Sequence, residues 1–212
     1  MPLEMSLSVV AVAAADGLRL DAPPASDLLV LSVPSLPPLP ELAIFTARMN
    51  RPVIVGTSGP ETRAVVLDRW GRVPVAAPSS ARDDRLVVHR LGGRLVGLMS
   101  GSDRHVPEKA RAMALMGVDL VLGFGRDPKP YGPLWAYTQQ NQFLALEVSG
   151  EPALYLACEM STDGSGAQPL EIRGGWAVVE LPWERRTRLL EAGSVLRDLN
   201  PEAYLIQPWW DG

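Results

Sequence analysis

The sequence predicts a single α/β domain with mixed β-sheets, and three observations lead to this prediction. Short apolar runs typical of strands outnumber the segments with helical periodicity. Some of these runs pair as hairpins, whereas others alternate with helices as strand–helix–strand units, so a purely parallel sheet is not expected. Neither an internal repeat nor a low-complexity linker divides residues 1–212, which have the length of one ordinary domain.

The first half of the chain contains strand, helix and hairpin signals in succession. Short apolar runs bounded by Gly, Pro or Asp are typical of buried strands, and a proline ahead of apolar residues at helical spacing is typical of a helix start. Residues 17–26 are too few and too proline-bearing for a full helix. These criteria predict strands at 7–16, 27–33 and 52–58, a helix at 41–50, and hairpins at 62–75 and 84–100.

The second half alternates helices and strands before an aromatic end. A proline at an early helical position, a glutamate in the first turn and a closing glycine mark the helix at 107–117. The same kinds of signal predict further helices at 133–142 and 183–197, strands at 118–124, 143–149, 153–160 and 176–182, a polar glycine-rich loop at 161–175, and an extended tail at 198–212.

Composition narrows the function classes. The net charge is −4 and no Lys/Arg cluster is interleaved with aromatic residues, so nucleic acid is not expected as a partner. No apolar run approaches the roughly 20 residues of a membrane-spanning helix. The single cysteine, Cys158, excludes an intramolecular disulfide and favours a cytoplasmic location.

Five segments, in this order along the chain, resemble the nitrilase (carbon–nitrogen hydrolase) superfamily. They are similar to the family's strand ending in Pro-Glu, its strand pair leading to an Asp-x-x-Gly turn, its Gly-x-x-hydrophobic-Cys-Tyr-Asp stretch with the following Pro-Glu helix and Gly-Ala-Asp, its helix ending in Glu-Asn, and its closing Arg-x-Pro-x-x-Tyr. The matching segments are SDLLVLSVPS (26–35), RPVIVG with TRAVVLDRWGRV (51–56 and 62–73), GGRLVGLMSGSDRHVPEKARAMALMGVDLVLGF (92–124), WAYTQQNQFLALEVSG (135–150) and VLRDLNPEAYLIQP (195–208).

The resemblance implies a four-layer αββα sandwich of two mixed sheets. It also implies a Glu–Lys–Cys triad that acts on amides or nitriles: the thiolate attacks carbon, the carboxylate moves the proton, and the ammonium stabilises the charge of the tetrahedral intermediate. The family places a long outer helix where residues 17–26 stand, so we expect that first outer helix to be shortened or missing.

None of the three triad residues is present at its expected position. With the motif aligned on Gly97 and Asp103, the cysteine position falls at Gly101. The glutamate position falls at Ser35 when Pro34 is the anchor, or at Val33 without gaps. The lysine position falls near Ser79 and Ser80, and both lysines of the chain, Lys109 and Lys129, lie after the nucleophile turn. The turn is therefore interpreted as a nitrilase elbow that has lost its nucleophile.

The elbow still carries polar side chains, and we expect them to form a vestigial pocket of Ser100, Gly101, Ser102 and Asp103. Together with His105 they suggest a substitute catalytic set. Members of such a set usually converge from separate segments, so a turn in which Ser102 or Asp103 caps the following helix is favoured.

For the other candidate residues we favour a structural role over a functional one. Glu41 would stabilise a helix N-terminus, Cys158 would be a buried core residue on a strand, and His89 and His105 are too few for a zinc site. Gln140 and Asn141 are expected to satisfy backbone groups at a helix end, and Asp127, Lys129 and Tyr131 are expected in a solvated loop.

The favoured function is a catalytically silent relative of the carbon–nitrogen hydrolases, retained for binding or assembly. An active hydrolase of amide-like substrates with rebuilt machinery and a small-molecule sensor remain alternatives, and no metal or cofactor is expected. Since proteins resembling nitrilases commonly pair by an outer helical face, we also expect a homodimer through helices 107–117 and 133–142. The apolar and aromatic residues offered for this interface are Ala112, Met113, Met116, Trp135 and Tyr137, with the tail at 205–212.

Overall fold

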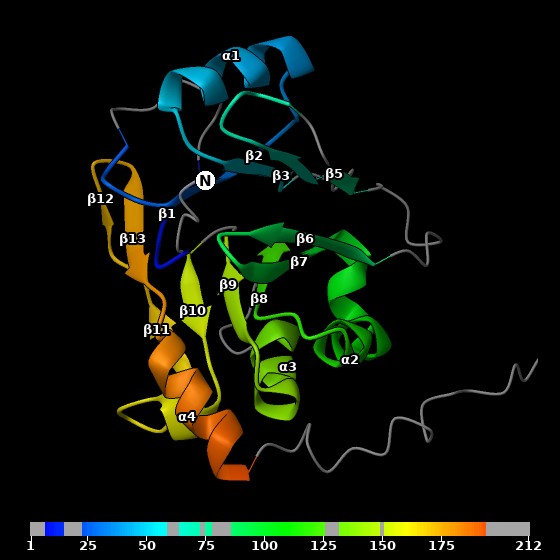
Figure 1. Cartoon of the computed structure of the whole chain (residues 1–212), viewed down its shortest axis with the longest axis vertical. Helices are drawn as coiled ribbons and strands as arrows, with labels where there is room; N and C mark the ends of the chain where they lie inside the picture. The colour runs from blue at the N-terminus through cyan, green and yellow to red at the C-terminus, as the bar shows by residue number, and fades with distance from the viewer. Residues whose placement is uncertain are drawn as a thin grey trace, which may run out of the picture.

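In the computed structural model the chain folds into two β-sheets that face one another, with helices on the outside (Figure 1). The structure describes residues 7–14, 23–58, 64–72, 75–77, 86–125, 132–148 and 151–193. Both sheets combine parallel and antiparallel neighbours, as predicted.

The first sheet has seven strands in the described part of the chain. Its parallel centre is formed by β1, β2 and β3, and the strands outside this centre pair antiparallel. The strand order is β12 (Ile172–Arg173), β13 (Trp176–Glu180), β1 (Val9–Ala14), β2 (Leu28–Val33), β3 (Val53–Thr57), β4 (Ala64–Leu67) and β5 (Val75–Ala77).

The second sheet has six strands in the described residues, again with a parallel centre, here β7, β8 and β9. Its strand order is β11 (Ala167–Pro169), β10 (Ala153–Tyr155), β9 (Leu144–Glu147), β8 (Leu120–Phe124), β7 (Arg94–Ser100) and β6 (Val87–Leu91). The predicted hairpin at 84–100 is the β6–β7 pair, and the one at 62–75 is the β4–β5 pair.

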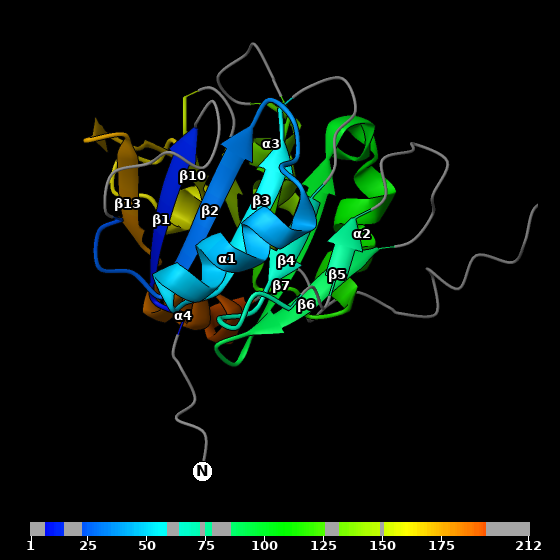
Figure 2. The same cartoon turned by 90° about the horizontal axis from the view of Figure 1, so that it is seen from above.

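Helices cover the outer faces of both sheets (Figures 1 and 2). Helix α1 (Leu39–Met49) lies over the first sheet, whereas α2 (Pro107–Leu115) and α3 (Pro133–Asn141) lie on the second, which gives the layers α, β, β, α. Helix α4 (Trp183–Gly193) lies at one end of the sandwich, and two short 3₁₀ helices, η1 (Gly101–His105) and η2 (Cys158–Met160), complete the described elements.

Strand alternation divides the apolar side chains between the layers. In β8, Leu120, Leu122 and Phe124 face the other sheet, and Val121 faces the helices. The largest cluster of buried residues therefore lies between the two sheets, and a smaller cluster lies under the helices on each outer face. Burial of these apolar surfaces is the main force that holds the four layers together.

The sequence predictions were wrong in two places. The strand expected at 153–160 ends at Tyr155, so Cys158 lies in η2 and is only partly buried instead of belonging to a core strand. The loop expected at 161–175 contains the short strands β11 and β12.

Two other expectations fall on parts of the chain that are only partly described. Of residues 17–26, only 23–26 lie within the described ranges, and these contain no helix. The tail at 198–212 lies outside the described residues.

Candidate functional site

The turn that the sequence marks as an elbow connects β7 to α2. Strand β7 ends at Ser100, η1 begins at Gly101, and α2 begins at Pro107. Gly101 has a φ of +53°, in the left-handed region where side chains are disfavoured. The position predicted for the family's cysteine is thus a glycine in a conformation suited to glycine.

The polar side chains of the elbow do not gather into a catalytic set. Ser100 is buried at the end of β7, Asp103 is partly exposed, and Ser102 and His105 are exposed to solvent. Among the described residues, no side-chain hydrogen bond or ion pair joins Ser102 to Asp103 or His105. A serine nucleophile needs a base within hydrogen-bond reach, and no side chain of the described residues is hydrogen-bonded to Ser102 as such a base.

The expected helix cap is wrong in detail. The N-cap residue of α2 is Val106, with no side-chain capping bond, and Ser102 and Asp103 lie within η1. The Asp103 carboxylate instead accepts a hydrogen bond from Lys109 Nζ at 2.7 Å. This ion pair joins η1 to the first turn of α2 and engages the one lysine of the described residues.

A buried ion pair links the elbow to the second sheet. The Arg104 side chain is buried, and its Nη2 donates to Glu147 Oε2 at the end of β9. Its Nη1 donates to the carbonyl oxygen of Gly125, just past β8, at 2.6 Å. Arg104 therefore joins the elbow to the ends of two neighbouring parallel strands, and neither ion is left uncompensated in the interior.

An aromatic ring fills the space between the sheets next to the elbow. Ser100 is the register partner of Phe124, the last residue of β8, which is fully buried. A Cβ atom on Gly56 of β3 would overlap the Phe124 ring. The ends of β3 and β8 are thus in direct contact across the sandwich, and the ring occupies the layer beside Ser100.

Neither position predicted for the family's glutamate carries a charged side chain. Ser35 is exposed beyond the end of β2, and Val33 packs in the outer cluster under α1, on the far side of the first sheet. Ser79 and Ser80 lie outside the described residues. Glu41 is an exposed acidic residue in the first turn of α1, as its helix-dipole interpretation predicts.

The remaining candidates are dispersed. Asn141 donates to the Tyr137 carbonyl oxygen at 3.0 Å, at the end of α3 as predicted, and Gln140 is exposed. His89 lies on β6, and burial lowers its pKa below the ordinary value of 6.5. The loop with Asp127, Lys129 and Tyr131 lies outside the described residues. No three His, Cys, Asp or Glu side chains of the described part of the chain lie close enough to hold a metal ion.

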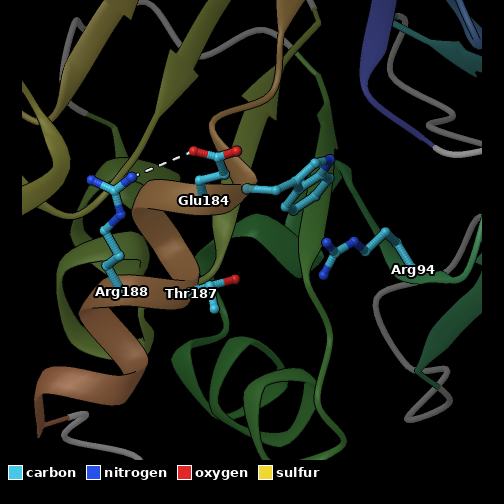
Figure 3. A pocket seen from close by; sticks show the side chains of 5 residues that line it. Arg94, Glu184, Thr187 and Arg188 are labelled. Atoms are coloured by element: carbon cyan, nitrogen blue, oxygen red, sulfur yellow. Dashed lines mark hydrogen bonds and ion pairs between the residues drawn. The ribbon is translucent and has the colours of Figure 1, made fainter.

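A shallow pocket of about 450 Å³ lies at the other end of β7, where Arg94 begins the strand (Figure 3). The Arg94 guanidinium stands 4.6 Å from the centroid of the Trp183 ring, and Glu184 pairs with Arg188 at 3.5 Å. Thr187 completes the lining. Sequence reasoning did not single out these residues, because ordinary surface charges on a helix carry no motif.

No helix in the described ranges combines the length and the apolar character needed to cross a bilayer.

The αββα sandwich is the fold of the nitrilase superfamily, as comparison with solved structures shows. An amidase from Nesterenkonia sp. superposes with a TM-score of 0.60 at 18% identity over 93% of this chain and 95% of that chain. A cysteine-to-alanine mutant of the Nesterenkonia AN1 amidase from the nitrilase superfamily has a TM-score of 0.61 at 17% identity over 93% and 96%. The corresponding mutant in complex with butyramide has a TM-score of 0.58 at 18% identity over the same shares. No protein-family model and no curated protein sequence matches this chain.

Proposed function

We propose that this protein is a catalytically silent homologue of the carbon–nitrogen hydrolases, retained for binding or assembly. The observation that carries the proposal is Gly101, which stands at the first position of the elbow with a φ of +53° and no side chain. Removal of a nucleophile alone costs many orders of magnitude in turnover, and the chain offers no aligned base or cation to compensate.

The contacts of the elbow argue against an active enzyme with rebuilt machinery. A serine nucleophile at Ser102 would need a base within hydrogen-bond reach, and Lys109 Nζ instead donates to the Asp103 carboxylate. His105 is exposed, on the same short turn. The sensor alternative receives little support at this end of the sandwich, because the Phe124 ring occupies the layer where a ligand would enter.

Intact-mass spectrometry after incubation with short aliphatic amides and activated esters tests the proposal. We expect no acyl adduct on the wild-type chain at neutral pH, other than thiol acylation by the esters that disappears in Cys158→Ala. An adduct that persists in Cys158→Ala and is lost in Ser102→Ala would overturn the proposal and identify a serine nucleophile.

The proposal includes a homodimer through α2 and α3. These helices contact one another on the outer face of the second sheet. Leu115 and Met116 at the end of α2 are 43% and 52% exposed, which is apolar area that a partner would cover.

Part of the surface expected for this interface is used within the chain itself. Met113 and Tyr137 are buried in the cluster between the helices and the second sheet. The Trp135 indole donates to the Ser165 carbonyl oxygen at 2.8 Å. Leu115 and Met116 therefore replace Met113 and Tyr137 as the residues on which the dimer proposal rests.

Light scattering coupled to size exclusion, at micromolar concentration, decides the oligomeric state. A dimer should weaken in Met116→Glu, whereas Val178→Glu, at an apolar position of similar exposure on β13, should leave it intact. Removal of residues 205–212 should also weaken it if the tail contributes. A single 22.9 kDa species in the wild type would contradict the proposal. A cytoplasmic location, favoured by the single cysteine, is part of the same proposal.

A further inference from the structure

A preformed aromatic and cationic surface lies on the opposite side of the molecule from α2 and α3. It is formed by Arg69, Trp70 and Arg72, which we call the Trp70 surface. Trp70 is 60% exposed, among the most exposed large apolar side chains of the described residues. It has no part in the elbow or in the core.

Two guanidinium groups hold the Trp70 ring in place. The Arg69 Cζ atom is 4.3 Å from the ring centroid, and the Arg72 Cζ atom is 4.8 Å from it. Arginine over the face of an indole is a favourable cation–π arrangement even at an exposed site. The stack presents a flat apolar ring with positive charge beside it.

The turn that carries this stack is closed by hydrogen bonds to the Asp68 side chain. Asp68 accepts the backbone N–H groups of Trp70 and Arg72, each at 3.0 Å, and the Arg72 Nε at 2.6 Å. Although slight burial acts the other way, these bonds lower the pKa of Asp68, so the carboxylate stays charged at neutral pH.

Gly71 allows the turn to pack closely against α1. It has a φ of +78°, and a Cβ atom there would meet the Ala43 carbonyl oxygen at 2.6 Å. This contact packs the turn against the middle of α1. A surface ordered before binding loses little conformational entropy when a partner docks.

We propose that the Trp70 surface is a docking site for an acidic peptide segment of another protein. Trp and Arg are the residue types most enriched among binding hot spots, and here they are exposed and ordered together. Arg72 is paired with Asp68, so Arg69 provides the charge for a carboxylate, and Trp70 provides the apolar contact. Two arginines against one aspartate leave the turn with a net positive charge on a chain of net charge −4.

Fluorescence anisotropy with a labelled peptide of Glu-Glu-Leu repeats tests the proposal on the full chain. We expect saturable binding that weakens at least about tenfold in Trp70→Ala and in Arg69→Glu. Arg173→Glu is the matched control, because Arg173 is an exposed arginine on β12 that pairs with Glu171, and the net charge changes equally. It should change the affinity by less than about twofold.

Four results would overturn the proposal. Equal losses in Arg69→Glu and Arg173→Glu would mean that only the overall charge attracts the peptide. Equal affinity for a Lys-Lys-Leu peptide, or no saturable binding, would exclude an acidic partner. Self-association of the wild type that Trp70→Ala abolishes would assign the surface to a second copy of the chain instead. Unchanged melting temperatures of the variants, expected for exposed side chains, exclude misfolding as the cause.

Discussion

The Phe124 ring lies against Gly56, so the last residue of β8 meets the first sheet where β3 has no side chain. These residues come from different sheets and are 68 positions apart in the sequence. Their contact brings the carboxyl ends of β3 and β8 together and closes the space between the sheets beside the elbow. Glycine at one position and phenylalanine at the other are therefore a matched pair.

Gly56→Ala should destabilise the protein by about 3 kcal/mol, because the new methyl group must displace a rigid ring inside a closely packed interior. Chemical denaturation monitored by circular dichroism measures this. Gly97→Ala is the control, since Gly97 is also a strand glycine without positive φ. Its new Cβ would meet chiefly the flexible thioether of Met113, so the loss should be clearly smaller.

The same pair permits a double-mutant test. Phe124→Ala alone should cost about 3 to 5 kcal/mol through the cavity that it leaves. In the double variant the methyl group introduced by Gly56→Ala enters part of that cavity, so the two losses should sum to more than the measured total. Strict additivity would mean that the two positions do not contact one another.

Arg186 should anchor α4 to the second sheet. It is buried, pairs with Asp119 at 2.7 Å, and donates to the Gln142 carbonyl oxygen at 3.0 Å. Arg186→Gln should cost about 3 kcal/mol, because it leaves Asp119 with only the more distant Arg94 as an ion-pair partner. Arg188→Gln, on the exposed side of the same helix, should change stability by less than about 0.5 kcal/mol. Equal effects of the two substitutions would refute this role.

Stability should fall when the pH drops below about 6.5, the ordinary pKa of histidine. Burial lowers the pKa of His89, so in this range the unfolded chain binds a proton that the folded chain does not. The loss begins near the unfolded pKa and is complete once the pH is below the lowered folded pKa. Urea midpoints between about pH 7 and 5 should therefore decline in the wild type and in His105→Gln, and decline less in His89→Gln. Identical profiles for the two histidine variants would contradict this.

Periodicity located most strands and helices because each carries its signal within a few residues. The strand predicted at 153–160 ends early because a side chain forms hydrogen bonds with the backbone groups that a neighbouring strand would otherwise pair with. Gln139 accepts from the Cys158 N–H at 2.8 Å and donates to the Leu156 carbonyl oxygen at 2.8 Å, so no neighbouring strand pairs there. An apolar run alone does not reveal such a competitor.

The candidate site was predictable only in its backbone. The turn, its glycine and the following helix were located from local motifs. The Arg104–Glu147 pair was not, since its members are 43 residues apart and meet only in the folded sheet. The one available signal was Glu147 itself, a charged residue within the apolar run FLALEVS, which calls for a buried partner.

Ammonia release from simple aliphatic amides decides whether the elbow is catalytic. We expect the wild type, Ser102→Ala and Gly101→Cys all to release ammonia at the rate of buffer alone. A cysteine at position 101 would stand in a left-handed backbone conformation, and without a partner base its thiol would be mostly protonated at neutral pH. Turnover by the wild type that is abolished in Ser102→Ala would refute catalytic silence and show that the elbow is a working active site.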